Sequence, residues 1–303
     1  MLHESFMQRL AFIRYLYNMA VEQSRQPEPL GAASILTFHD SVELFLQLAC
    51  EHLNVETKKN LGFMEYWDLL APKLADDKLT QKVPMRRLND TRVSLKHHGT
   101  LPSTLTIEGS RASVTNFFEE NTPLVFGIEF GSISMTNLVK CAEARSSLEE
   151  ASRLIQEGKP EDAIDKIAVA FVQLVGDYEK SGQTWYGHSP FYFGKDLKLE
   201  TSFSMGIEDR KAASFVDNTN RRIGALQGVV KILSLGLDYR RYVKFIRLAP
   251  HVTRFPGGDS GDRYEIARLR KTELPSIEEY RFCYDFVIDS AIRLQEFEVG
   301  VEK

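Results

Sequence analysis

The segment richest in residues that could do chemistry is Arg92-Val-Ser-Leu-Lys-His97-His98-Gly99. An arginine holds a phosphate through paired hydrogen bonds, and a histidine exchanges a proton near neutral pH. Together they suit cleavage of RNA, in which one group stabilises the charged phosphate while another takes the ribose 2′-hydroxyl proton. The candidate catalytic residues are Arg92, His97 and His98.

One amphipathic helix is expected to position these side chains. Pro84 suits its first turn, and Gly99 marks its end. Arg92 stands where the apolar stripe of this helix calls for an apolar residue. The stripe consists of Met85, Leu88 and Leu95. Arg92 is therefore expected to face a seam between helices, where it needs a carboxylate of the chain or an external phosphate.

The same helix carries a row of basic residues, although the chain has a formal net charge of -4. A local excess of positive charge suits a phosphate backbone, and it also fits an ordinary solvated helix face. The candidate phosphate-binding residues are Lys82, Arg86, Arg87 and Lys96.

A preceding helix, from about residue 35 to residue 53, has an apolar stripe wide enough to contact two neighbours. It is expected at the centre of a helical bundle. Glu43 lies beside this stripe and is the candidate structural partner of Arg92. A buried pair of Arg92 with Glu43 and a catalytic role for Arg92 are both compatible with the pattern.

Arg92 and His97, with four intervening residues, resemble the R-x4-6-H motif of the HEPN superfamily, and His98 fits it with five. The likeness covers about the first 120 residues and includes the segment from Phe38 to Glu43. It implies an all-α bundle that dimerises about a two-fold axis and cleaves RNA without a metal or cofactor. Family members often act as toxins or phage-defence effectors that an antitoxin or a sensor protein keeps silent.

One residue departs from that pattern. Active family members usually carry a polar residue directly after the arginine, whereas this chain has Val93. The departure favours the alternative function, a non-catalytic HEPN-like scaffold for dimerisation or nucleotide sensing.

The composition, with 43% hydrophobic and 26% charged residues in 303, is that of a globular protein. The three cysteines lie far apart and lack the spacing of a zinc site, so no metal is expected. The sequence shows neither an N-terminal signal pattern nor an apolar run of membrane-spanning length. We therefore expect a cytoplasmic protein without membrane contacts.

The predicted fold class is all-α, with a HEPN-like helical domain at residues 1–133 and a mainly helical domain with irregular loops at 134–303. Within the first domain, residues 105–109 are expected to be extended and residues 114–120 to form a short helix. The second domain opens with a helical hairpin over 141–178 that turns at Gly158.

Later elements of the second domain are less uniform. An aromatic loop is expected at 185–194, followed by a helix over 210–237 and a last helix that begins with a capping box at Ser276 and Glu279. The helix over 210–237 is expected to point Leu226, Val230 and Leu233 inward. A further helix is expected to carry a basic stripe of Arg240, Lys244, Arg247 and His251.

Overall fold

The computed structural model describes residues 3–74, 78–181, 203, 205–255, 257, 261–268 and 275–296. The chain divides into two compact units, Met1–Leu138 and Val139–Lys303, called unit one and unit two. Within the described residues the fold is all-α apart from one two-stranded antiparallel sheet, so the predicted fold class is confirmed.

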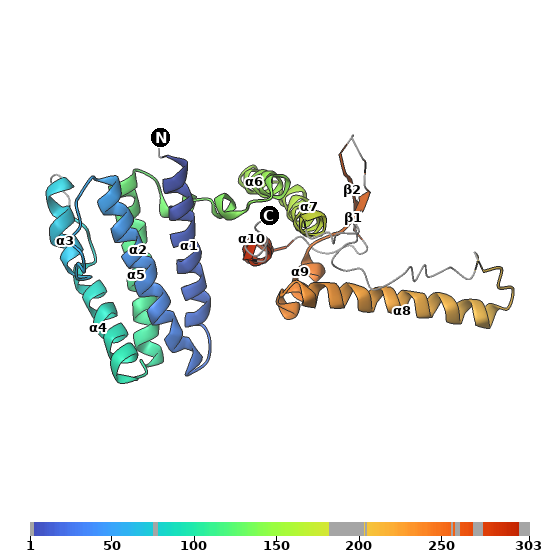
Figure 1. The fold of residues 1–303 in the computed structure, drawn as a ribbon, viewed down its shortest axis with the longest axis horizontal. Coiled ribbons are helices and arrows are strands. Elements are labelled where there is room, and N and C mark those ends of the chain that lie inside the picture. The colour runs from blue at the N-terminus through green and yellow to red at the C-terminus, as the bar shows by residue number, and fades with distance from the viewer. Residues whose placement is uncertain are drawn as a thin grey trace. The chain divides into compact units, whose positions relative to one another are not determined.

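Unit one is a bundle in which four long helices lie side by side (Figure 1). The short helix α3 and several 3-10 turns complete it. Helix α2 contacts α1, α3, α4 and α5, as expected for the central helix of the bundle. The helices are α1 (Glu4–Ser24), α2 (Ala33–His52), α3 (Glu65–Leu70), α4 (Lys82–His98) and α5 (Thr104–Phe126).

Aromatic side chains fill the core between α2 and α5. Phe45 of α2 meets Phe117 and Phe118 of α5 edge to face, with ring centroids 5.3 and 5.6 Å apart. All three side chains are fully buried. Each such ring contact adds about 0.5–1.5 kcal/mol to the burial of its area, so these contacts fix α5 on α2.

The first unit extends to Leu138, five residues past the boundary expected from the sequence. Phe130 stacks on Phe118 at a centroid distance of 4.5 Å. Residues Met135–Leu138 form a 3-10 turn that packs on α1, where Asn18 reaches the Met135 sulfur at 3.4 Å. This segment belongs to unit one because its apolar side chains are buried there.

Residues 104–126 form one continuous helix, so the expected extended segment and short helix were wrong. The hydroxyl of Ser103 caps the helix by accepting from the backbone N–H of Thr106 at 3.2 Å, and Gly127 ends it at a φ of 68°. The burial of Val114, Phe117 and Phe118 against α2 outweighs the weak helix propensity of the Gly, Ser and Thr residues before them.

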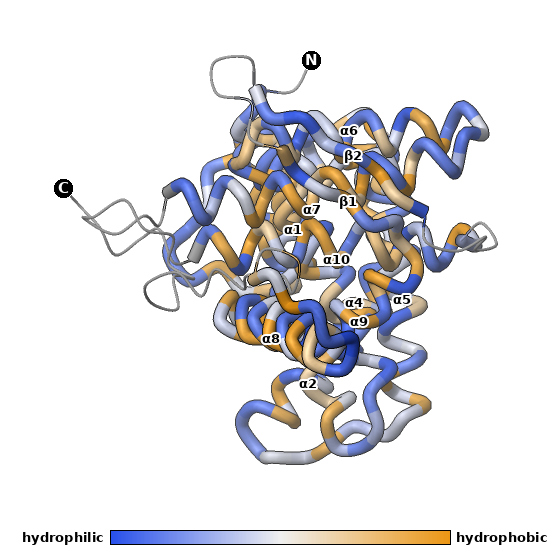
Figure 2. Tube along the Cα trace, turned by 90° about the vertical axis from the view of Figure 1, so that its right-hand side faces the viewer, coloured by the Kyte–Doolittle hydropathy of each residue, from blue (hydrophilic) through white to orange (hydrophobic). Residues whose placement is uncertain are grey.

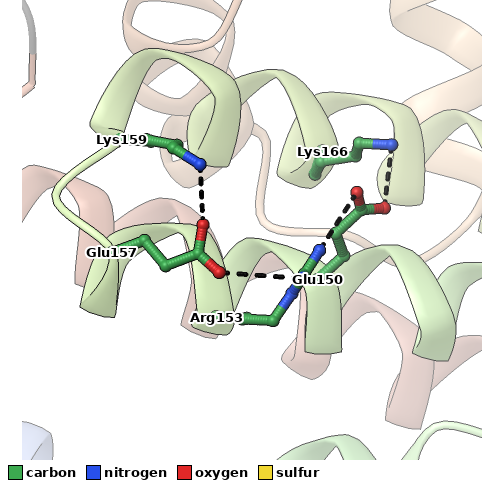
Figure 3. A network of polar contacts seen from close by, with 5 residues as sticks. All are labelled: Glu150, Arg153, Glu157, Lys159 and Lys166. Carbon is green, nitrogen blue, oxygen red and sulfur yellow. Dashed lines mark hydrogen bonds and ion pairs between the residues drawn. The ribbon is translucent and has the colours of Figure 1, made fainter.

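Unit two begins with the predicted helical hairpin, α6 (Ala142–Gln156) and α7 (Pro160–Ser181), which turns at Gly158 with a φ of 74°. An exposed network of ion pairs joins its two helices (Figure 3). Lys166 of α7 meets Glu150 of α6 at 2.8 Å, while Arg153 lies 3.6 Å from Glu157. Lys159 meets Glu157 at 2.8 Å.

The remaining elements of unit two are α8 (Arg210–Ser234), α9 (Tyr239–Leu248), β1 (His251–Phe255), β2 (Arg263–Ala267) and α10 (Ile277–Glu296). The predicted capping box begins α10: Ser276 N donates to Glu279 Oε2 at 2.9 Å, and Glu279 N donates to Ser276 Oγ at 3.2 Å. Helix α10 packs on α7 and α9.

Two expectations for unit two were wrong. Leu226, Val230 and Leu233 are exposed on α8, whereas Ile232 is its buried residue, so the inward face differs from the one expected. Hydrophilic and hydrophobic positions are interspersed along this helix (Figure 2). His251 opens strand β1, paired with Ala267, because the helix before it ends at Leu248. The expected aromatic loop at 185–194 lies outside the described residues.

Among the helices that the structure describes, none combines the length and the apolar character that crossing a membrane requires.

Candidate functional site

The start of α4 is fixed by a buried amide. Asn121 of α5 accepts from the Thr80 backbone N–H at 2.9 Å and donates to the Thr80 hydroxyl at 3.0 Å. The Trp67 indole donates to the Thr80 carbonyl at 3.0 Å. Met85 and Leu88 are then buried in the core. These contacts set the rotation of α4 about its axis and therefore which side chains face α2.

The end of α4 is closed by Gly99, as the sequence predicts. Gly99 lies in the left-handed region at a φ of 66°, and its N–H donates to the Leu95 carbonyl at 3.2 Å. Thr100 N donates to the Ser94 carbonyl at 3.1 Å. The bond from Gly99 to Leu95 is that of an αL cap, which stops the helix and leaves His97 and His98 exposed in its last turn.

Arg92 is half-buried on the side of α4 that faces α2. Its charge lies near enough to His39 of α2 to help lower the pKa of that imidazole. Within the described ranges, Arg92 forms no ion pair or hydrogen bond, and none joins it to His97 or His98. A charged guanidinium in such a position lacks an anion.

The buried pair of Arg92 with Glu43, one of the two arrangements compatible with the sequence, is not formed among the described side chains. Glu43 instead lies opposite His39, with its Oε2 3.6 Å from the His39 Nδ1. The two residues are four apart on α2, so they share a face of that helix. The carboxylate of Glu43 also helps to raise the pKa of Tyr66, after burial of that phenol, which has the larger effect.

His39 is the residue at this seam to which the sequence analysis assigned no role. Its side chain is 3% exposed, and its ring stacks on Phe63 with centroids 4.2 Å apart. Nε2 lies 3.1 Å from the Oδ1 of Asn89 on α4. Burial lowers the pKa of His39, and the charge of Arg92 lowers it further, although the carboxylate of Glu43 and the Asn89 hydrogen bond oppose this. His39 falls on the wide apolar stripe of α2, which was the signal that it is buried.

The basic row on α4 contains one cation with an ion pair and three exposed cations for which no ion pair is found among the described residues. Lys82 meets Asp68 of α3 at 2.5 Å, so its charge is partly neutralised. Arg86, Arg87 and Lys96 are exposed. Three of the four predicted phosphate-binding residues therefore present their charge to solvent.

Of the basic stripe expected in α9, Lys244 is engaged within unit two, whereas Arg240 and Arg247 are exposed. Lys244 lies over the Phe282 ring at 4.1 Å, and the neighbouring Arg241 pairs with Asp289 at 2.5 Å. His251 is not on this helix. The stripe is thus shorter than the sequence indicated.

Unit two also holds a polar cavity of about 190 Å³ where β1 meets α7. Arg254 of β1 donates to Asp262 at 2.6 Å and passes against α7 at Gly176. A Cβ at position 176 would lie 2.3 Å from the Arg254 guanidinium, so a larger residue there would make the Arg254 side chain shift. Because its central cation is already paired, this cavity offers less to an anion than the seam beside Arg92.

Comparisons of the chain with protein-family models, curated proteins and solved structures found no match. The candidate site is therefore defined by the geometry of α2 and α4 alone.

Proposed function

We propose that unit one binds RNA along α4 and cleaves it without a metal, as the HEPN-like motif implies. The observation that carries this proposal is the half-buried Arg92, which has no ion-pair partner among the described residues. Arginine keeps its charge at any physiological pH, so it calls for an anion that the described residues do not supply. The exposed cations Arg86, Arg87 and Lys96 on the same helix favour a phosphate backbone as that anion.

The chemistry assigns one role to each residue type. His97 takes the proton of the ribose 2′-hydroxyl, whose oxygen attacks the adjacent phosphorus, and His98 is the second histidine beside it. The bond from phosphorus to the 5′-oxygen breaks, and a protonated histidine supplies the proton to that leaving oxygen. Arg92 binds the non-bridging oxygens as they gain negative charge. The expected products are a 2′,3′-cyclic phosphate and a free 5′-hydroxyl.

A two-fold dimer solves a geometrical problem in this scheme. Residues five apart on a helix point about 140° apart, and here Arg92 faces the seam with α2 while His97 is exposed. We propose that Arg92 of one subunit and His97 of its partner act on the same phosphate. Neither side chain then has to reach around its own helix.

Mixing two inactive variants tests this arrangement. Arg92→Ala and His97→Ala should each be inactive alone, whereas their mixed dimer contains one site with both residues intact. Cleavage should therefore reappear on mixing, up to about half of the wild-type rate per mixed dimer. The control is a mixture of Arg92→Ala with the double variant Arg92→Ala/His97→Ala, which should stay inactive. No recovery, with mixed dimers verified by mass spectrometry, would rule out the shared site.

The second candidate function is a non-catalytic HEPN-like scaffold that dimerises or senses a nucleotide. Val93 directly after Arg92 favours it, since Val93 brings no polar group to the site. In that case the wild-type protein binds RNA or a nucleotide but leaves RNA uncut. A toxin or phage-defence role, with an antitoxin or sensor protein as partner, belongs only to the catalytic proposal. It predicts that expression arrests growth and that His97→Ala abolishes the arrest.

A further inference from the structure

Besides Arg92, the seam between α2 and α4 contains a cluster of three potential metal ligands on α2: His39, Asp40 and Glu43. One ligand atom from each lies within 4.8 Å of the others. The His39 Nδ1 is 3.8 Å from the Asp40 Oδ1 and 3.6 Å from the Glu43 Oε2. The two carboxylates thus face the same imidazole nitrogen.

That nitrogen is buried and has no hydrogen-bond partner in the part of the chain that the structure describes. The amide oxygen of Asn89 can only accept, so the proton of the neutral imidazole lies on Nε2 and the lone pair on Nδ1. A lone pair directed between two carboxylates is unfavourable, and both distances are too long for hydrogen bonds. The side chain of His39 is only 3% exposed, so water gives it little compensation.

We propose that His39 Nδ1, Asp40 and Glu43 bind a divalent transition-metal ion such as Zn²⁺. Nitrogen and oxygen ligands of this kind bind such ions at about 2.0–2.2 Å, which separates two ligands of a tetrahedral site by roughly 3.4 Å. The observed separations of 3.6 and 3.8 Å approach that value. Rotation of the 61% exposed Asp40 and the 33% exposed Glu43 side chains is enough to close the difference.

The surroundings of the cluster resemble those of metal-binding histidines. A ligating histidine usually donates its second ring nitrogen to an acceptor that fixes the tautomer, and Asn89 supplies this acceptor. The stacked Phe63 ring holds the imidazole plane. The two carboxylates neutralise a divalent ion, while the nearby charge of Arg92 opposes it and moderates the affinity. Three protein ligands leave a coordination position open to water.

The metal site is distinct from the proposed chemistry, in which no step uses an ion. Its test uses the full chain without a histidine tag, in the His97→Ala/His98→Ala background, which removes the adjacent exposed histidines as adventitious ligands. Co²⁺ is the probe in visible absorption, and Zn²⁺ the probe in calorimetry. One equivalent of each should bind, and Co²⁺ should show the d–d bands of a nitrogen and oxygen site.

Carboxylate variants locate the ion. Asp40→Asn and Glu43→Gln should each lower the Zn²⁺ affinity by at least about tenfold. Mutation of a residue that only hydrogen-bonds to a metal ligand already lowers metal affinity by about 10–100-fold. Asp90→Asn removes an exposed carboxylate from the facing helix α4 and should leave the affinity unchanged. Both ligand variants keep His39 in place, and circular dichroism checks their fold. No binding of either ion in this background, or equal affinity in all three variants, would overturn the proposal.

Discussion

The imidazole Nε2 of His39 on α2 lies 3.1 Å from the amide oxygen of Asn89 on α4, which joins the two helices at the seam where Arg92 is found. The contact buries a polar group beside a core of apolar and aromatic side chains. Asn89 lies one turn before Arg92, so it sets the face that α4 presents to α2.

Asn89→Ala should therefore destabilise unit one. It leaves the His39 Nε2–H without its acceptor, and an unsatisfied buried donor costs about 1–3 kcal/mol of unfolding free energy. Urea unfolding of a fragment covering residues 1–138, with EDTA present, measures this loss. Asp90→Asn, on the exposed side of the same helix, should change the free energy by less than about 0.5 kcal/mol. Equal effects of the two changes would show that the contact is not made.

The segment after α5 provides a second stability prediction. Phe130 stacks on Phe118 and also contacts Tyr17 at 5.3 Å, so Phe130→Ala should lower the stability of the same fragment by about 3–5 kcal/mol. Phe12→Ala removes a ring that is 45% exposed and should cost much less. If Phe130→Ala is as mild as Phe12→Ala, the segment does not belong to the core of unit one.

The cysteines predict a graded thiol reactivity. Cys50 and Cys283 are buried, and burial raises the pKa of the Cys283 thiol to about 12. Burial also raises the pKa of Cys141, but this thiol is partly exposed. Because the thiolate is the reactive form, the folded protein should react first at Cys141, and slowly. Labelling with a thiol reagent followed by mass spectrometry checks the order, and rapid labelling of Cys283 in folded protein would contradict it.

RNA binding should depend on the exposed cations of α4. Arg86→Gln/Arg87→Gln/Lys96→Gln removes three charges and should weaken binding and flatten its salt dependence, since each phosphate contact releases counterions. The matched control removes three cations from the surface network of unit two (Figure 3) by Arg153→Gln/Lys159→Gln/Lys166→Gln. Fluorescence anisotropy at several salt concentrations compares the two. An equal loss of RNA affinity in the two triple variants would mean that binding depends only on the net charge of the protein.

The sequence was sufficient for the helical features that depend on local pattern. The stop at Gly99, the turn at Gly158 and the capping box at Ser276 follow from residue types whose backbone preferences act within a few positions. It was not sufficient for α5 or for the inward face of α8. Those depend on packing against helices distant in the sequence, which outweighs local propensity.

At the candidate site, too, the sequence predicted the features set by local pattern but not those set by packing between helices. Position 92 was correctly placed at a seam, because the stripe on α4 fixes that side. The residue that Arg92 contacts could not be derived from the sequence. Glu43 and His39 of α2 both lie close to the seam, and the rotation of α2 about its axis decides which side chains they contact. The structure pairs Glu43 with His39, and no described carboxylate pairs with Arg92.

The most direct test of the proposed function is cleavage of a defined RNA by the full chain with EDTA present. The wild-type protein should produce fragments ending in a 2′,3′-cyclic phosphate. Arg92→Ala should abolish cleavage while lowering stability by less than about 1 kcal/mol, since no ion pair is lost, whereas a buried pair would cost about 3–5 kcal/mol. RNA left uncut by the wild-type protein in EDTA, together with a strongly destabilised Arg92→Ala variant, would contradict the proposal and assign Arg92 to the scaffold.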